Sequence, residues 1–269
     1  MATSIVVCGA AGRMGRTLIG LIAQNPAVRL AGAVEAAGNP TLGKDAGDVA
    51  GVGSLGVVIQ SDFQALASPD RVALDFTSAE AAVTHLRLAV QQQSPIVIGA
   101  TGFTPALQAE LDELAPRTRC VVAPNMSVGI AVLQRLVREA ARALGEEFDP
   151  EIVEMHHRMK VDAPSGTALA LARTVADATG RELTRDAVYG REGLVGKRRA
   201  GELGVLALRG GDVVGDHRVL LLGEGERLEL GHVAGSRLTF ARGALAAARW
   251  VVGREPGLYG IREVLGLGG

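Results

Sequence analysis

Two adjacent histidines and a nearby lysine are the side chains of this sequence best suited to moving protons. His156, His157 and Lys160 lie in the run EMHHRMKVDAPSGT, which spans residues 154–167. The chain has five histidines and three lysines, and its other basic residues are arginines, which keep their protons near neutral pH. A lysine can lose its proton when its surroundings lower its pKa. This stretch therefore favours proton chemistry, although a solvated basic loop would have the same composition.

The end of the same run predicts the start of a helix. Ser165 is a candidate N-cap, and Gly166 and Thr167 open an Ala- and Leu-rich segment. A helix N-terminus offers N–H groups to an anion. A plain cap would have the same sequence, but His157 and Lys160 nearby strengthen the case for a carboxylate or phosphate of a substrate.

A strand must bring the histidines to this place. Residues 151–157 alternate like a β-strand, in which His156 and His157 would point to opposite faces. Both imidazoles can reach one pocket only if the strand ends or bends there. We therefore predict such an end or bend.

A nucleotide-binding loop is predicted near the N-terminus. An apolar run at 4–8 precedes GAAGRMG at 9–15, and residues 12–23 have helical spacing. A strand, a glycine turn and a helix N-terminus in this order form a pyrophosphate site. Ala11 stands where the common G-x-G-x-x-G fingerprint has its second glycine, so the loop alone is a weak signal. Its candidate cofactor contacts are Gly9, Ala10, Ala11, Gly12, Arg13, Met14 and Gly15.

An acidic residue strengthens this prediction. Glu35 follows a strand expected at 29–34 and lies about 20 residues after Gly15, the offset at which dinucleotide-binding folds place an acid on the adenosine ribose. A structural turn and a solvated glutamate are the alternative. The strand, glycine loop, helix, second strand and acid in this order favour nucleotide binding. The next residues are Ala-Ala-Gly, without an arginine for a 2′-phosphate. We therefore expect NADH to serve at least as well as NADPH.

The first half continues to alternate strand and helix. Strands are expected at 56–60, 72–76, 95–98 and 119–123, and helices at 79–92 and 104–114. Strands this apolar suit a parallel sheet buried on both faces, where ligands bind beyond the carboxyl ends. The loops at these ends should line one crevice. Their candidate cofactor residues are Phe76, Thr77, Gly99, Ala100, Thr101, Ala123, Pro124, Asn125 and Met126.

The second half changes pattern. A helix is expected at 128–144, hairpins of an antiparallel sheet at 203–209, 213–222 and 227–232, and a last helix at 237–252. His217 and His232 are interpreted as structural and His85 as lying on a helix surface. The basic run 197–199 is interpreted as a solvated loop, with a mobile lid as the alternative.

Composition narrows the class of protein. The 269 residues are 48% hydrophobic and 21% charged, which is typical of a globular protein of one large or two smaller domains. A net charge of -1 gives no general attraction to nucleic acid or to an anionic membrane. Cys8 and Cys120 lie in apolar runs, which favours free thiols in a reducing cytoplasm. No metal site, signal peptide or membrane span is expected.

Several ordered segments together resemble the bacterial dihydrodipicolinate reductases (4-hydroxy-tetrahydrodipicolinate reductases) of lysine and diaminopimelate biosynthesis. The resemblance covers nearly the whole chain and is most specific at 154–168. The other matching segments are the loop at 9–15, DFT at 75–77, IGATGF at 98–103, PNMSVG at 124–129 and GDVVGDH at 211–217.

The resemblance implies an α/β fold with two domains. The first, residues 1–127 rejoined by 241–269, would be a Rossmann-like, doubly wound parallel sheet that binds NADH or NADPH. The second, residues 128–240, would be a substrate-binding α+β domain whose open mixed or antiparallel sheet forms a homotetramer. The implied reaction is the NAD(P)H-dependent reduction of the dihydrodipicolinate or 4-hydroxy-tetrahydrodipicolinate ring, a small dicarboxylate, to tetrahydrodipicolinate.

The resemblance also implies roles for single residues. His156 would be the general acid/base and Lys160 a second proton donor, and repulsion among the cations should lower the pKa of His156. His157 and Lys160, with Ser165, Gly166 and Thr167, would hold the substrate carboxylates. Two positions depart from the family pattern. Ala100 lacks the hydroxyl of the threonine that many members have, and Ala36 replaces an arginine common in members that favour NADPH.

Two other classes of protein remain open at this point. Another nicotinamide-dependent reductase of a small carboxylated substrate would share the glycine loop and Glu35, but would not need the His-His-x-x-Lys run. A non-catalytic dinucleotide sensor would need only the first half of the chain.

Overall fold

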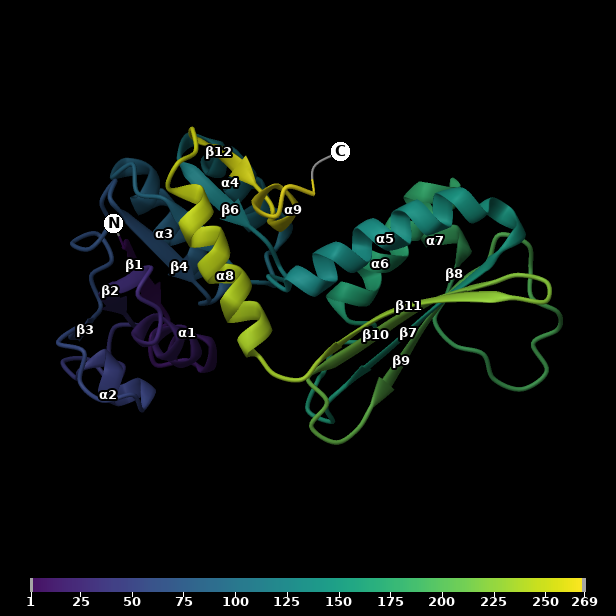
Figure 1. Cartoon of the computed structure of the whole chain (residues 1–269), viewed down its shortest axis with the longest axis horizontal. Coiled ribbons are helices and arrows are strands. Elements are labelled where there is room, and N and C mark those ends of the chain that lie inside the picture. The colour runs from purple at the N-terminus through teal and green to yellow at the C-terminus, as the bar shows by residue number, and fades with distance from the viewer. Residues whose placement is uncertain (1, 268–269) are drawn as a thin grey trace. The chain divides into compact units, whose positions relative to one another are not determined.

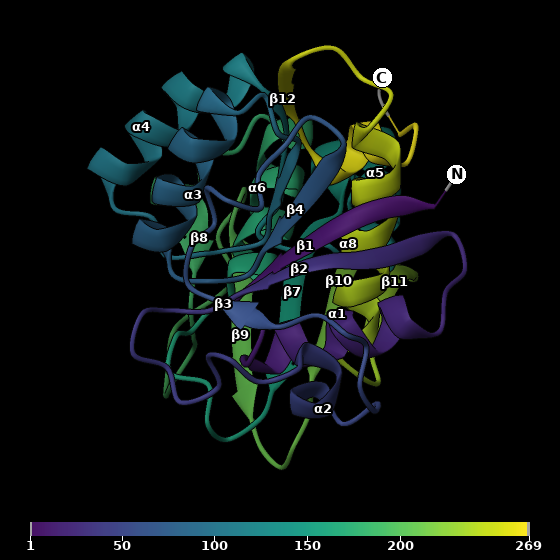
Figure 2. The same ribbon diagram turned by 90° about the vertical axis from the view of Figure 1, so that its left-hand side faces the viewer.

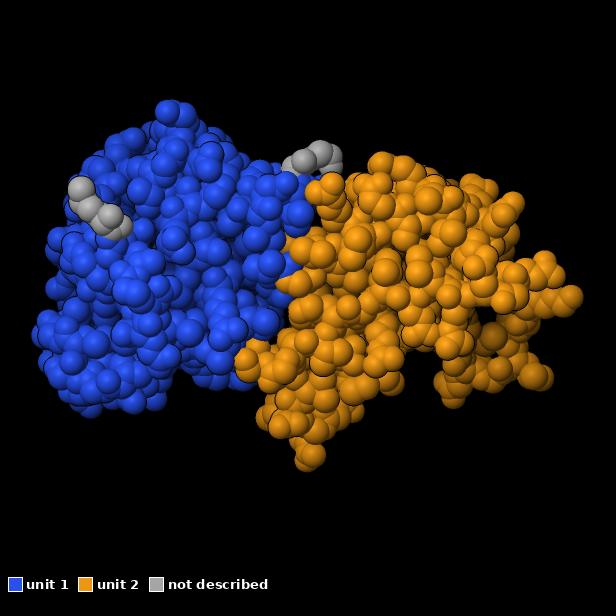
Figure 3. Space-filling view, in the orientation of Figure 1, with its two compact units in different colours: residues 1–128, 237–269 blue, residues 129–236 orange. Residues whose placement is uncertain are grey.

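The computed structural model describes residues 2–267 and divides the chain into two compact units. Unit 1 comprises Met1–Val128 and Arg237–Gly269, and unit 2 comprises Gly129–Ser236 (Figure 3). The chain therefore leaves unit 1 once, builds unit 2 from one continuous segment, and returns.

Unit 1 is built on a seven-stranded sheet (Figure 1). The strand order is β12-β6-β5-β4-β1-β2-β3, and each neighbouring pair is parallel. The order of connection reverses between β1 and β4, which confirms the predicted doubly wound arrangement. The strands are β1 (Thr3–Cys8), β2 (Val28–Val34), β3 (Ile59–Gln60), β4 (Arg71–Asp75), β5 (Ile96–Ile98), β6 (Arg119–Val122) and β12 (Gly257–Tyr259).

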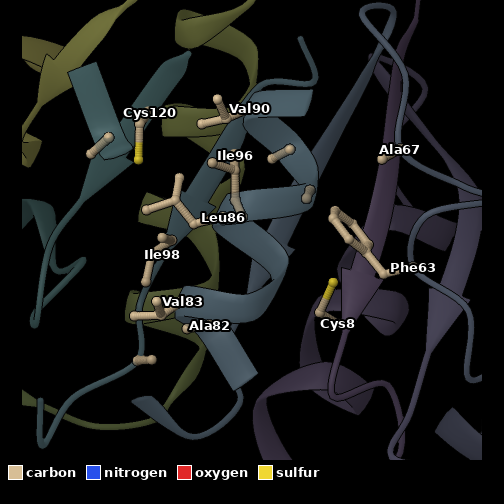
Figure 4. Packing of buried hydrophobic residues seen from close by; sticks show 14 of the residues in the cluster. Cys8, Phe63, Ala67, Ala82, Val83, Leu86, Val90, Ile96, Ile98 and Cys120 are labelled. Carbon is tan, nitrogen blue, oxygen red and sulfur yellow. The ribbon is translucent and has the colours of Figure 1, made fainter. Parts of the chain in front are cut away.

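Helices cover both faces of this sheet, as its apolar strands require. Helices α1 (Arg13–Ala23) and α8 (Leu238–Val251) pack together on one side, and α3 (Ala79–Gln91) and α4 (Pro105–Leu114) pack together on the other (Figure 2). Beneath α3, the buried side chains of Val83 and Leu86 belong to one cluster with Ile96, Ile98 and Cys120 of the sheet (Figure 4).

The carboxyl ends of the central strands lie level with one another. Cys8 at the end of β1 pairs with Val34 of β2 and with Asp75 of β4. Asp75 pairs with Ile98 of β5, which pairs with Val122 of β6. The loops after these five residues therefore leave the sheet at one edge, where ligands bind in sheets of this kind.

Unit 2 is a five-stranded mixed sheet with two long helices on one face. The strand order is β11-β10-β7-β9-β8, with β7 parallel to β9 and antiparallel to β10. Helices α5 (Val128–Leu144) and α6 (Gly166–Thr179) pack on it through a buried core that includes Ile152, Val205 and Val219. The strands are β7 (Asp149–His156), β8 (Ala187–Val188), β9 (Leu203–Arg209), β10 (Gly215–Leu222) and β11 (Arg227–Ala234).

The predicted hairpin between β9 and β10 is wrong. Both segments are strands, but β7 lies between them in the sheet. Their connection instead closes the end of β7, because Gly210 N–H donates to His156 O at 3.0 Å and Arg158 N–H donates to Gly211 O at 3.2 Å. The antiparallel hairpin of this unit is formed by β10 and β11.

Two other predictions, the strand at 56–60 and the solvated loop at 197–199, are only partly right. The strand expected at 56–60 is reduced to β3, because the Asp45 carboxylate takes the N–H groups of Leu55 at 2.9 Å and Val57 at 3.1 Å. The basic run 197–199 is not simply solvated, since Arg198 forms ion pairs with Asp149 and Glu151.

Several short elements of the structure were not predicted from the sequence. They are α2 (Ala46–Ala50), the 3₁₀ turns Ala115–Arg117 and Gly145–Glu147, α7 (Leu183–Asp186), β8, β12 and α9 (Ile261–Val264). Within residues 2–267, each helix is too short or too polar to cross a bilayer.

Candidate functional site

The end of β7 holds a buried carboxylate and a histidine that are bonded to each other. Glu154 Oε2 lies 2.6 Å from His156 Nδ1. The same carboxylate accepts N–H groups from Nη1 and Nη2 of Arg209, each at 2.8 Å, and the backbone N–H of Ser165 at 3.0 Å. The Glu154 side chain is 0% exposed, so these donors replace the water that a charged group needs.

This contact decides which nitrogen of His156 can exchange a proton. Because a carboxylate only accepts, Nδ1 carries the proton between the two groups and Nε2 is left for chemistry. Burial is the largest effect on His156 and lowers its pKa. Contact with Glu154 raises the pKa, whereas the positive charge of Lys160 lowers it further. The predicted direction is confirmed, but burial, rather than repulsion among cations, is the main cause. A lowered pKa makes the protonated ring a stronger acid.

Glu154 stays ionised through its hydrogen bonds. Burial alone would raise the pKa of Glu154, but the bonds from Arg209, His156 and Ser165 outweigh it and hold the pKa below its usual range. The pair is therefore a carboxylate with an imidazole, which fixes the ring and can stabilise its positive charge.

A second histidine packs against this pair. The rings of His217 on β10 and His156 meet edge to face with centroids 5.1 Å apart, and His217 Nε2 lies 3.2 Å from Ser165 Oγ. Burial, then the nearby His156, lowers the pKa of His217 to about 4, so this ring is neutral at pH 7. Gly215 makes room for the arrangement, since a Cβ there would lie 3.1 Å from His156 Nε2.

Strand β7 ends at His156, which confirms the predicted end of the strand between the two histidines. His157 begins a turn in which its carbonyl accepts the N–H of Lys160 at 3.1 Å. His157 Nδ1 is buried and has no hydrogen-bond partner within residues 2–267. A buried nitrogen in this state calls for water or a ligand.

Lys160 is tied to the same cluster through its loop. Its Nζ lies 2.8 and 2.9 Å from the two carboxylate oxygens of Asp162, and Arg209 Nη2 donates to Asp162 O at 2.7 Å. Arg209 therefore joins the lysine loop to Glu154. The positive charge of Lys160 also disfavours a second positive charge on His156, and so contributes to the lowered pKa of that ring.

The predicted N-cap of α6 is confirmed, and it defines what Ser165 can do. Ser165 Oγ accepts the N–H of Ala168 at 3.1 Å, and the residue is buried. Its own N–H is taken by Glu154, so Ser165 supports the cluster from inside the protein. Gly166 is exposed and Thr167 half-buried, which leaves these two residues at the accessible end of the helix.

In unit 1 the glycine loop is shaped by close backbone contacts. Gly9 has a φ of +78°, a conformation that favours glycine. A Cβ at Gly15 would lie 2.1 Å from Gly9 O and 2.8 Å from Ala10 Cα, so the start of α1 can approach the loop only with glycine there. Gly12 places no side-chain cap on α1, and the first N–H groups of the helix suit a pyrophosphate.

Glu35 reaches this loop. Its Oε2 accepts the N–H of Ala11 at 2.9 Å, and its Oε1 accepts the N–H of Ala36 at 3.0 Å. The carboxylate thus lies against the glycine loop, where the fold places the adenosine ribose.

The other candidate cofactor residues lie at the start of α1 and after the ends of β4, β5 and β6. Arg13, Thr101 and Pro124 are exposed, and Met14, Phe76, Thr77, Gly99 and Asn125 are half-buried. Ala100, Ala123 and Met126 have buried side chains, so they can offer a ligand only their backbone. The predicted site residues therefore form two groups, one within each unit.

Three members of the unit 2 cluster were not predicted. Glu154 could have been found, because alternation along β7 places it on the same face as His156. Arg209 and His217 come from β9 and β10, where they stand beside His156 and Glu154 respectively. Only the pairing of distant strands brings these two residues to the cluster.

Comparison with known proteins gives one consistent result. Family models described as "Dihydrodipicolinate reductase, N-terminus" and "Dihydrodipicolinate reductase, C-terminus" match residues 3–126 and 129–265. The 4-hydroxy-tetrahydrodipicolinate reductase of Syntrophus aciditrophicus is 48% identical over 261 residues, or 97% of each chain. The enzyme of the same description from Anaeromyxobacter dehalogenans is 50% identical over 268 residues, or 99% of each. A solved structure, a dipicolinate-bound dihydrodipicolinate reductase from Paenisporosarcina sp. TG-14, is 25% identical with a TM-score of 0.75, covering 98% of this chain and 99% of that one.

Proposed function

The chain belongs to the dihydrodipicolinate reductase family, and on this premise we propose which of its residues carry out each part of the NAD(P)H-dependent reduction. The protein is an oxidoreductase of lysine and diaminopimelate biosynthesis. The observation that carries the proposal is the pair of Glu154 and His156, in which a buried carboxylate holds Nδ1 and leaves Nε2 for the substrate.

The residues of unit 1 fit a dinucleotide. The N–H groups at the start of α1 and the loop from Gly9 to Gly15 would hold the pyrophosphate, and Glu35 would bind the adenosine ribose. The loops after β4, β5 and β6 would border the nicotinamide end, which supplies the hydride when the cofactor is bound.

The residues of unit 2 supply the proton and bind the dicarboxylate. Reduction of a conjugated imine or enamine adds a hydride at one carbon and a proton at another. Protonated His156 delivers that proton from Nε2 while Nδ1–H stays with Glu154, and Lys160 serves as the second donor. His157, Lys160 and the start of α6 at Gly166 and Thr167 bind the carboxylates by charge and by N–H groups.

The direct test is NADH oxidation by the purified protein with the condensation product of aspartate semialdehyde and pyruvate. We expect oxidation that depends on this product, with kcat/KM for NADH at least equal to that for NADPH, because Ala36 offers nothing to a 2′-phosphate. A strong preference for NADPH would overturn the cofactor assignment. Cofactor binding without turnover would favour a sensor, and turnover only with another carboxylated substrate would favour a different reductase.

We also propose that the protein works as a cytoplasmic homotetramer formed through the open face of the unit 2 sheet. That face carries a hollow whose lining combines the apolar residues Val153, Met155, Leu208, Leu220 and Leu222 with the charged residues Glu154, Asp216, Arg218, Arg227 and Glu229. Leu208 is 48% exposed, and exposed apolar patches of this kind mark protein interfaces. We expect Leu208→Glu to dissociate the assembly. Light scattering measures the molar mass of the wild-type protein and of the variant in solution. A monomeric wild-type protein would contradict the proposal.

A further inference from the structure

The predicted place of His85 on the surface of α3 is wrong. Its side chain is 14% exposed, and its ring packs against Phe63 with centroids 4.8 Å apart. His85 Nδ1 lies 2.6 Å from Oδ2 of Asp75, the last residue of β4, whose side chain is buried. His85 therefore turns inward and meets a carboxylate at the edge of the sheet where the cofactor loops leave it.

The other oxygen of this carboxylate holds Thr77. Asp75 Oδ1 accepts the backbone N–H of Thr77 at 2.9 Å and its hydroxyl at 2.6 Å. A carboxylate removed from water needs donors on both oxygens, and losing one of them leaves the charge partly unsatisfied. His85 thus completes the set of donors that keeps Asp75 directed at Thr77.

Thr77 and its neighbour Phe76 pack against two of the other cofactor loops, those of Gly9 and Gly99. Thr77 Cγ2 lies 3.2 Å from the position that a Cβ of Gly9 would take, and Phe76 Cε1 lies 2.2 Å from the corresponding position at Gly99. Both glycine positions are therefore packed against residues of the β4 exit. A displacement of Thr77 would be passed directly to the pyrophosphate loop, because close-packed groups transmit shifts.

We propose that His85 is a positioning residue for dinucleotide binding, because it holds the Asp75 carboxylate that fixes Thr77 against Gly9. The inference rests on the proposed function in one respect, the assignment of these loops to the cofactor. It adds that NADH affinity depends on a hydrogen-bond donor at the place of His85 Nδ1.

Cys8 lies close enough to suggest a metal site instead. One ligand atom from each of Cys8, Asp75 and His85 lies within 4.8 Å of the others. A soft metal ion needs the thiolate, but burial, followed by the charges of Asp75 and Glu35, raises the pKa of the Cys8 thiol well above its usual value. The 2.6 Å contact between Asp75 and His85 is a hydrogen-bond distance, so the geometry favours a proton between them over a metal ion.

The test compares His85→Asn with His85→Leu. The amide nitrogen of asparagine stands where Nδ1 stands in histidine, so H85N keeps a donor for Asp75, whereas H85L keeps apolar packing and has no donor. We expect H85L to raise the Kd for NADH by about tenfold or more, and H85N to stay within about threefold of wild type. Nicotinamide fluorescence measures the Kd. The kcat at saturating NADH and the KM for substrate should change little, because the proposed proton donor and substrate residues belong to unit 2.

Val90→Ala on the same helix controls for lost stability. Val90 is a buried core residue, so its truncation should lower Tm and leave the Kd for NADH unchanged. If H85L does not fold, His85→Gln replaces it in the test. The glutamine amide nitrogen stands near the place of Nε2 and not of Nδ1, so H85Q should bind NADH more weakly than H85N. Wild-type NADH affinity in the variant without the donor, or equal weakening in H85N, overturns the positioning role. Wild-type protein that does not bind NADH overturns the proposed function instead.

Discussion

Replacement of His156 by glutamine is expected to lower kcat by about 10²–10⁴-fold, the usual contribution of a positioned general acid or base. The glutamine amide nitrogen stands near the place of Nε2 and can hydrogen-bond, but it has no proton to release at working pH. Binding of NADH and of the substrate carboxylates depends on other residues, so both KM values should change less than kcat. Steady-state kinetics of NADH oxidation measure the difference.

The pH profile of the wild-type enzyme tests the same assignment. His156 acts as an acid only while protonated, and burial lowers its pKa from the usual 6.5. The kcat/KM, which reports the free enzyme, should therefore fall as pH rises through a value below 6.5. Bound carboxylates favour the imidazolium, so kcat should fall at a higher pH than kcat/KM. The residual activity of His156→Gln should show neither the decrease in kcat/KM nor the decrease in kcat with rising pH.

His232→Gln is the matched control for this experiment. His232 lies on β11 of the same unit, opposite His217, and burial lowers its pKa as well. It belongs to the strand beyond the cluster, so its variant should keep a kcat close to wild type. A His156→Gln enzyme that loses no more activity than His232→Gln would remove His156 from the mechanism.

Features decided by a few neighbouring residues were predictable from the sequence. Thr104 caps α4 through the N–H of Leu107, and Ser165 caps α6 through the N–H of Ala168. The end of β7 at His156 followed from asking how two adjacent histidines could share a pocket. Helix caps depend on local chemistry, which the sequence displays directly, and the end of β7 could be inferred from the alternation of side chains along a strand.

Pairing between distant strands was not predictable in this way. A glycine turn at 210–212 between two β patterns favours a hairpin. The structure instead pairs Glu151–His156 of β7 with Gly204–Arg209 of β9, about 50 residues further along the chain. A turn signals that the chain reverses, but the neighbours of a strand depend on which apolar faces pack together in the finished unit.

The surroundings of the proton donor depend on that pairing. Repulsion from Lys160 could be expected from the sequence, whereas the burial that dominates the lowered pKa of His156 could not. Arg209 reaches Glu154 across 55 residues, and the inward turn of His85 needs both Asp75 and Phe63. Helical spacing could place His85 on α3, but it could not reveal a buried carboxylate beside it.

Glu154→Gln is expected to lower kcat by about 10–100-fold, although Glu154 acts only through His156. Oε2 of the carboxylate accepts from His156 and Arg209, and Oε1 accepts from Ser165 and Arg209. Glutamine replaces one oxygen by an NH₂ group, so in either orientation of the amide, donors face donors. The contact at Nδ1 selects the tautomer, and without it the ring can turn or carry its proton on the wrong nitrogen.

The pH profile separates this positioning role from a general loss of structure. Glu154 raises the pKa of His156, and Arg209 lowers it. Glu154→Gln should therefore move the fall in kcat/KM to lower pH, and Arg209→Met should move it to higher pH. Partial unfolding alone would reduce the activity at every pH and leave the position of the fall unchanged.

Glu151→Gln is the matched control, because Glu151 is also a buried carboxylate of β7. It pairs with Arg191 and Arg198 and lies on the opposite face of the strand from Glu154. Removal of one partner from a buried ion pair costs up to about 3–5 kcal/mol, so both variants should lower Tm. Only Glu154→Gln should shift the pH profile. Equal shifts in the two variants, or no shift in Glu154→Gln, would show that Glu154 does not position His156.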